Sequence, residues 1–189
     1  MPTPTPLLVY RVGYVEEHAL ESLLAGLRSA YKSHKAVYVG DIEPPVTAYN
    51  WRRRQYDSTT LLHTLLKKTS PHAPTLFVAG VDAYADNLNF VFGEALLGQG
   101  AAIVYTPRLK PEFYGDEPNP LLYIERLIKE SLHELGHAFG LRHCPTPGCV
   151  MNFSNSILEV DEKKPAYCQR CAEILAENGV LVNEEYILA

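Results

Sequence analysis

Residues 119–143 read NPLLYIERLIKESLHELGHAFGLRH and predict the helix around which the rest of the chain is organised. Asn119 is a favourable N-cap, and Pro120 suits the first helical position, where a missing N–H has no consequence. Apolar side chains recur at helical spacing and form a broad stripe: Leu121, Ile124, Leu127, Ile128, Leu132 and Leu135. Gly140 is placed to end the helix in a left-handed turn. We therefore expect a helix of about 20 residues, or roughly 30 Å.

The end of this helix has three histidines at the spacing of a metal site. His133 and His137 are four residues apart, so their imidazoles project from one helical face. The glycine at position 140 allows the chain to turn back, and His143 then supplies a third ligand from outside the helix. Three protein ligands leave one tetrahedral position open for water, which is typical of a catalytic zinc. Glu134 lies close enough to reach that water without being a ligand.

The pattern H-E-x-x-H-x-x-G-x-x-H, from His133 to His143, resembles the zinc-binding motif of the metzincin peptidases. The resemblance implies a methionine-containing turn beneath the metal. Residues 149–152, Cys-Val-Met-Asn, match that turn, and Met151 is the only methionine besides Met1. Some metzincins have a tyrosine two residues later as an extra metal ligand. This chain has Phe153 there, so we expect no such ligand.

Four cysteines follow the third histidine: Cys144, Cys149, Cys168 and Cys171. The last two form a C-x-x-C pair, which is a strong signal for structural zinc, whereas the C-x4-C spacing of the first two is a weaker one. Two disulfides would suit a secreted protein, but the N-terminal sequence does not resemble a secretory signal. A redox pair or inert buried thiols remain as alternatives. We expect four thiolates around a second, structural zinc.

Taken together, the two motifs resemble the archaemetzincins, a family of compact metzincin-like proteases. The shared pattern is H-E-x-x-H-x-x-G-x-x-H-C-x4-C-x-M followed by C-x-x-C, within residues 133–171, and residues 88–93 are similar to the family's edge strand. The resemblance implies that the three histidines bind the catalytic zinc, that the four cysteines bind a second zinc, and that Glu134 is the general base. The pattern has no departure in this chain.

The remainder of the sequence alternates strand and helix patterns. Strands are expected at residues 7–14, 36–40, 76–79 and 101–105, an edge strand at 87–92, and helices at 16–31, 57–69 and 171–178. This order predicts an α/β fold with a mixed, mostly parallel sheet, an antiparallel edge strand and flanking helices. We expect residues 1–140 to form an α/β subdomain that includes the active-site helix. Residues 141–189 would form a small C-terminal subdomain with the third histidine, the methionine turn and the second zinc.

Length and charge narrow the class of protein. The chain has 189 residues and a formal net charge of −5, from 17 basic and 22 acidic residues, which offers no basic field for a nucleic acid backbone. The exception is the run Trp51-Arg52-Arg53-Arg54, which we expect to be a solvated loop. No segment is long and apolar enough for a membrane helix. We expect a monomeric cytoplasmic protein without nucleic acid or membrane partners.

The metal site and its glutamate predict zinc-dependent hydrolysis of a peptide bond. Zinc would lower the pKa of a bound water toward about 7, and Glu134 would take its proton and pass it to the leaving amine. The predicted edge strand could pair with an extended peptide or protein substrate. An aminopeptidase, a non-peptide amide hydrolase and a zinc-bound interaction protein without turnover remain as alternatives.

Overall fold

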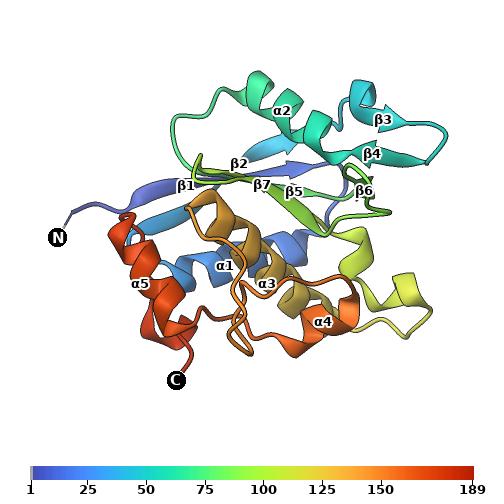
Figure 1. The fold of residues 1–189 in the computed structure, drawn as a ribbon. Coiled ribbons are helices and arrows are strands. Elements are labelled where there is room, and N and C mark those ends of the chain that lie inside the picture. The colour runs from blue at the N-terminus through green and yellow to red at the C-terminus, as the bar shows by residue number, and fades with distance from the viewer. Residues whose placement is uncertain (1) are drawn as a thin grey trace.

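A five-stranded sheet forms the centre of the molecule in a computed structural model that describes residues 2–189 (Figure 1). Its strands are β1 (Thr5–Val12), β2 (His34–Ile42), β5 (Thr75–Ala79), β7 (Gly93–Leu96) and β8 (Ala101–Tyr105), in the order β2-β1-β5-β8-β7. The pairs β1–β2, β1–β5 and β5–β8 are parallel, and only β7 runs antiparallel to its neighbour. The predicted mixed sheet with an antiparallel edge strand is therefore confirmed.

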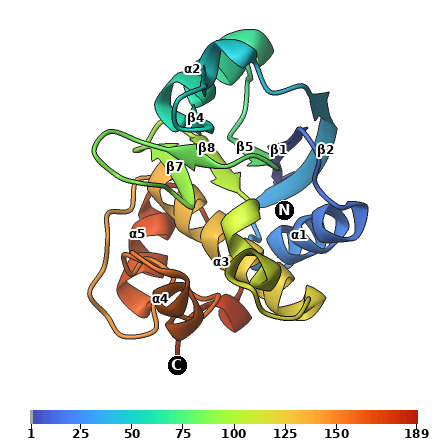
Figure 2. The ribbon, with the colours of Figure 1, turned by 90° about the vertical axis from the view of Figure 1, so that its right-hand side faces the viewer.

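Helices cover both faces of this sheet, which accounts for the apolar composition of its central strands. Every residue of β5 and β8 is buried, as expected for parallel strands with helices on both sides. The helix α2 (Ser58–Thr69) packs on one face, and α1 (Glu17–Ala30) and α3 (Pro120–Ala138) pack on the other (Figures 1 and 2). The helices α4 (Ile157–Glu162) and α5 (Gln169–Glu177) lie beside α3, on the side away from α1 (Figure 2).

Smaller elements complete the fold. The strands β3 (Tyr49–Asn50), β4 (Gln55–Asp57) and β6 (Ala83–Tyr84) form a second, three-stranded sheet. Four short 3-10 helices lie at Val46–Ala48, Pro107–Leu109, Pro111–Tyr114 and Glu184–Tyr186. Residues 51–54, the predicted arginine-rich loop, form the exposed turn between β3 and β4. Among residues 2–189, no helix combines the length and the apolar character that a membrane span requires.

The helix predictions were accurate to within two residues at each end, because their caps are local. The Asp57 side chain accepts a hydrogen bond from the Thr60 N–H (3.1 Å), and the Asn119 side chain accepts one from the Leu122 N–H (3.1 Å). Gly140 has φ of +105°, as a left-handed turn requires. The last helix starts two residues before the predicted position, since Cys168 is its N-cap.

The predicted edge strand at residues 87–92 was wrong in position: this segment is a loop, and the strand begins at Gly93. Asp86 has φ of +46°, and the Leu88 N–H donates to the Ala85 carbonyl, so the chain turns here. The carbonyls of Leu88 and Asn89 accept hydrogen bonds from the Arg53 side chain rather than from a neighbouring strand. The alternating polar and apolar residues of this segment belong to a loop that buries Phe92 and half-buries Phe90.

The main hydrophobic core extends from the sheet into the C-terminal residues. It joins residues of β1, α1 and α3 with Val150, Tyr167 and Leu175. The Tyr167 hydroxyl donates to the Leu132 carbonyl (2.7 Å), and the Tyr31 hydroxyl lies 2.7 Å from the Tyr167 oxygen. Since the Tyr167 proton is directed to the carbonyl, Tyr31 is the donor in the second bond. The division into 1–140 and 141–189 stays a prediction.

Replacing Tyr167 with phenylalanine tests this connection. Tyr167→Phe leaves the buried Tyr31 hydroxyl without its acceptor, so the free energy of unfolding should fall by about 1–3 kcal/mol. Denaturant unfolding followed by circular dichroism measures the change. The matched control is Tyr14→Phe, because Tyr14 is 76% exposed and should shift stability by less than about 0.5 kcal/mol. Equal midpoints for the two variants would contradict a structural role for the tyrosine pair.

Candidate active site and metal centres

The three predicted histidines converge on one point beside the end of α3. Their ligand atoms all lie within 4.8 Å of one another, and the Nε2 atoms of His133 and His137 are 3.1 Å apart. A tetrahedral zinc with Zn–N distances of about 2.0–2.1 Å requires nitrogen atoms about 3.3 Å apart. The His143 ring centroid lies 5.3 Å from that of His133 and 4.7 Å from that of His137. The donor set therefore fits a zinc ion.

Backbone carbonyls orient two of the imidazoles. His133 Nδ1 lies 2.8 Å from the Val150 carbonyl oxygen, and His137 Nδ1 lies 2.7 Å from that of Leu141. A carbonyl can only accept, so each Nδ1 must be the protonated nitrogen, which leaves the Nε2 lone pair free for a metal. Burial lowers the pKa of all three histidines below the usual 6.5, which favours the neutral, ligating form.

A glycine within the motif allows the methionine turn to pack against the helix. A Cβ atom at Gly136 would lie 2.4 Å from the Met151 Sδ. Met151 is fully buried, and its carbonyl accepts from the Cys144 N–H (3.0 Å). Gly136 has no role among the features predicted from motif spacing. A glycine inside a helix is about 1 kcal/mol less favourable than alanine, so its presence there was a signal for close packing.

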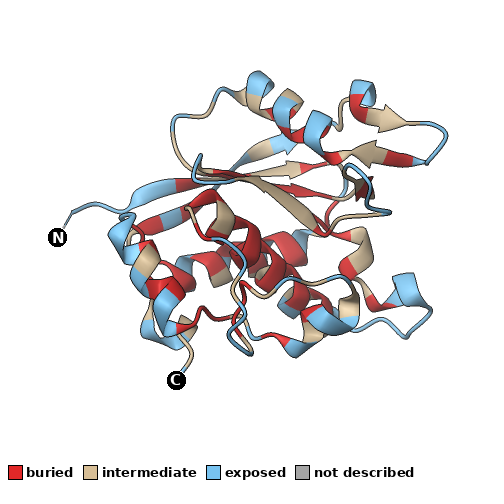
Figure 3. Cartoon of the chain, in the orientation of Figure 1, coloured by how far each residue is buried: buried red, intermediate tan, exposed pale blue. Residues whose placement is uncertain are grey.

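Glu134 lies against the first residue of the edge strand. Residues 131–136 of α3 are all buried (Figure 3), and a Cβ atom at Gly93 would come within 2.6 Å of the Glu134 Cγ and 2.9 Å of its Oε1. Burial raises the pKa of Glu134 well above its usual value, and the nearby Glu130 carboxylate raises it further, whereas Lys163 partly offsets both. A carboxylate in this environment accepts a proton readily.

These residues line a cavity of about 380 Å³. The loop of residues 88–93 forms one wall, residues 153–155 form another, and Glu130 and Glu134 line it together with the three histidines. Phe153, at the position where some metzincins have tyrosine, places its ring centroid 5.1 Å from that of His143. It has no oxygen to offer to a metal.

Basic residues hold the loop of residues 88–93 in place. Arg53 donates to the Leu88 carbonyl (3.1 Å) and the Asn89 carbonyl (3.3 Å), and its guanidinium lies 3.9 Å from the Tyr84 ring centroid. Arg108 lies 4.4 Å from the Phe90 ring centroid. The sequence predicts a solvated loop for the arginine run at residues 51–54. That description holds for the exposed turn as a whole, but the tip of Arg53 binds the wall of the cavity.

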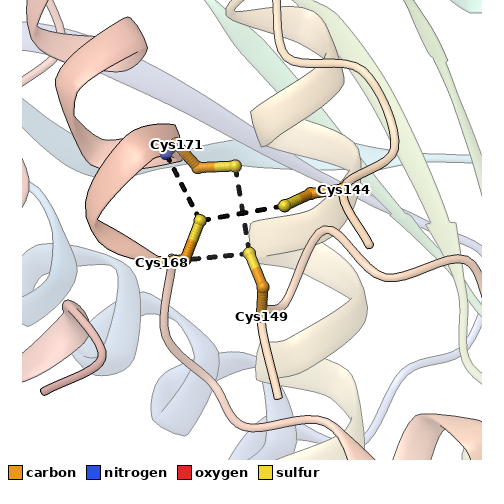
Figure 4. A group of neighbouring side chains, drawn as sticks. All are labelled: Cys144, Cys149, Cys168 and Cys171. Carbon is orange, nitrogen blue, oxygen red and sulfur yellow. Dashed lines mark hydrogen bonds between the residues drawn. The ribbon is translucent and has the colours of Figure 1, made fainter. Parts of the chain in front are cut away.

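The four cysteines form a second cluster (Figure 4). The Sγ atoms of Cys144 and Cys168 are 3.7 Å apart, and those of Cys149 and Cys171 are 3.9 Å apart. A disulfide would require about 2.05 Å, whereas four thiolates around zinc at about 2.3 Å require about 3.8 Å. The thiol–thiol contact with Cys171 lowers the pKa of Cys149 to about 5. The cluster therefore fits a structural zinc site.

Comparison with known proteins agrees with this geometry. Residues 12–177 match the model of peptidase family M54. An archaemetzincin of Methanocaldococcus jannaschii is 46% identical over 142 residues, which cover 75% of this chain and 78% of the relative. One of Methanopyrus kandleri is 40% identical over 163 residues, covering 82% and 90% of the two chains. The chain belongs to the archaemetzincin family, M54. It is a zinc metallopeptidase, as the sequence predicted.

Solved structures of this family have the same fold. The crystal structure of the M. kandleri archaemetzincin superposes with a TM-score of 0.82 at 36% identity and covers 93% of this chain and 95% of that one. The structure of an archaemetzincin from Archaeoglobus fulgidus, complexed with malonate, has a TM-score of 0.75 at 38% identity and covers 88% and 98%. The family assignment therefore extends to the fold of the whole chain.

A substitution at Gly136 tests the packing of the methionine turn. The methyl group of Gly136→Ala would overlap the buried Met151 sulfur, so we expect a loss of about 1–3 kcal/mol in stability. Thermal unfolding measures this loss. Gly40→Ala is the control, because a Cβ atom there meets nothing within 4 Å. If Gly136→Ala were as stable as the control, the close approach of helix and turn would be contradicted.

Proposed function

We propose that His133, His137 and His143 hold the catalytic zinc of this peptidase and that Glu134 is its general base. The observation that supports the proposal most strongly is the position of Glu134, which lines the same cavity as the three converging imidazoles. A zinc ion held by these histidines would supply a Lewis acid for the scissile carbonyl and would lower the pKa of a nearby water. The other steps fall to side chains of the chain itself.

Glu134 is suited to move a proton twice. Its carboxylate accepts a proton from the attacking water, and its raised pKa keeps that proton available. The same oxygen can then donate to the nitrogen of the leaving amine. His133 and His137 remain oriented throughout by their bonds to the Val150 and Leu141 carbonyls. The reaction would thus be hydrolysis of a peptide bond with one residue in both proton-transfer roles.

The edge strand β7 provides a way to align an extended substrate. Its first residue, Gly93, meets Glu134, and beyond its other end the Gly98 N–H donates to the His137 carbonyl (2.9 Å). Antiparallel pairing is the slightly more stable arrangement for an added strand. In that arrangement the substrate residues before the scissile bond lie beside Leu96, and those after it lie beside residues 88–92. A peptide or protein substrate is therefore accommodated across the metal site.

We further propose that Cys144, Cys149, Cys168 and Cys171 hold a structural zinc, so that the chain binds two zinc ions. Cys144 directly follows His143, and Cys168 and Cys171 lie at the start of α5. A metal shared by these residues would fix the loop that presents the third histidine. The monomeric state, the cytoplasmic location and the lack of nucleic acid and membrane partners stay predictions from the sequence.

The role of Glu134 is tested by Glu134→Gln, which preserves side-chain size and removes the proton acceptor. Hydrolysis of a mixed peptide library, followed by mass spectrometry, should slow by about 10²–10⁴-fold, with the zinc content unchanged. Glu125→Gln is the matched control, because Glu125 is 52% exposed and lies on the same helix. Wild-type turnover in Glu134→Gln would remove Glu134 from the mechanism.

Zinc content tests the two metal sites separately. Elemental analysis of the wild-type protein should give two zinc ions per chain, and both His137→Ala and Cys171→Ser should give one. The two variants should differ in stability, because a structural zinc contributes to folding directly whereas an open catalytic site contributes less. We expect a lower unfolding temperature for Cys171→Ser than for His137→Ala. A wild-type count of one would show that one of the two clusters binds no zinc.

A further inference from the structure

A second carboxylate, not used by the proposed mechanism, lines the catalytic cavity. Glu130 lies one helical turn before Glu134 on α3 and is only 3% exposed. Lys163, at the end of α4, is 2% exposed and places its Nζ 2.7 Å from the Glu130 Oε1. The Lys163 Nζ also lies 3.3 Å from the Asn152 carbonyl oxygen. A buried ion pair therefore borders the cavity, and Glu130 is the residue of that pair that lines it.

The carboxylate of Glu130 retains capacity to accept hydrogen bonds. Its Oε1 is held by the Lys163 ammonium at 2.7 Å. A carboxylate can accept about four hydrogen bonds, so one ion pair leaves part of that capacity unused. Ser154 lines the same cavity, and its hydroxyl has no hydrogen-bond partner within the protein. A ligand that supplies hydrogen-bond donors therefore fits this end of the cavity.

The position of Glu130 assigns it to one side of the scissile bond. This step rests on the proposed function, in which the substrate pairs antiparallel to β7. Because Glu134 meets Gly93 at the start of β7, Glu130 lies on the side of residues 88–92, toward the C-terminal part of the substrate. The walls there are apolar and include Phe90 and Phe92. A long apolar stem with a polar end fits such a cavity.

We propose that Glu130 is a specificity-determining residue: it selects, directly after the scissile bond, a long side chain whose end donates hydrogen bonds. Glutamine, lysine and arginine meet this description. Glutamate has nearly the same size as glutamine but places a second carboxylate against Glu130, and methionine has nearly the length of the lysine stem without a donor. The comparison of glutamine with glutamate therefore isolates the hydrogen-bonding chemistry from the volume of the side chain.

The experiment uses one peptide series in which only the residue after the scissile bond varies, as glutamine, glutamate, lysine or methionine. Wild-type kcat/KM should favour glutamine over glutamate by about ten- to a hundred-fold, the range that a hydrogen bond to a charged group supports. In Glu130→Gln the preference should fall toward one, because an amide can both donate and accept. A purely structural role would lower kcat/KM for all four peptides equally and would overturn the proposal.

Three further variants support the test, and the first of them covers the case in which Glu130→Gln does not fold. Glu130→Gln combined with Lys163→Met removes both charges, so it provides the same comparison if the single variant fails to fold. Ser154→Ala leaves the ion pair intact and should reduce the preference more weakly. Glu125→Gln, on the exposed side of the same helix, should keep the wild-type preference. An unchanged preference for glutamine in both Glu130 variants would overturn the proposal.

Binding separates this inference from the proposed function. The zinc-loaded Glu134→Gln protein should bind the same peptides without rapid turnover, and competition for a fluorescent peptide gives their relative affinities. If the wild-type protein cleaves none of the peptides but the affinity order depends on Glu130, the peptidase mechanism fails and the specificity assignment holds. If the wild-type protein cleaves all four without preference, the mechanism holds and the specificity assignment fails.

Discussion

The hydrogen bond between the His133 ring and the Val150 carbonyl is the contact on which the catalytic centre depends. It joins the active-site helix to the turn beneath it and determines which nitrogen of the ring can reach a metal. The contact is possible only because Gly136 leaves room for the Met151 sulfur. The active-site helix and the methionine turn thus approach each other closely, and this approach positions the proposed metal ligand His133. The two residues in contact, His133 and Val150, lie 17 positions apart in the sequence.

The second cluster extends the same constraint. Cys144 follows the third histidine, while Cys149 precedes Val150, whose carbonyl orients the first histidine. The cysteines of α5 meet both, and Tyr167, next to Cys168, contacts the Leu132 carbonyl just before His133. A metal at the four thiols would therefore stabilise the positions of two of the three proposed zinc ligands, His133 and His143. This arrangement allows a short C-terminal segment to support an active site without a large core of its own.

The wall opposite this segment is held by side chains as well as by backbone bonds to strands: the Val91 N–H donates to the Ala83 carbonyl, and the Phe92 carbonyl accepts from the Tyr105 N–H. The carbonyls of Leu88 and Asn89 accept hydrogen bonds from the Arg53 side chain. The Arg108 guanidinium lies 4.4 Å from the Phe90 ring centroid. Arg108 in turn forms an ion pair with Asp82 (2.7 Å). The cavity is thus enclosed by a loop of defined shape, which is the condition for discriminating between substrate side chains.

The sequence alone determined the features that follow from local spacing. The helix from Pro120, its caps, the two histidines on one face and the turn at Gly140 all depend on residues close together along the chain, where helical periodicity and backbone stereochemistry leave few choices. The order of strands and helices likewise predicted the mixed sheet. Only the tertiary structure decided the loop at residues 87–92, the contact of Gly93 with Glu134, and the pairing of Glu130 with Lys163. These depend on segments distant in sequence, and residue type by itself does not indicate which distant groups a side chain will meet.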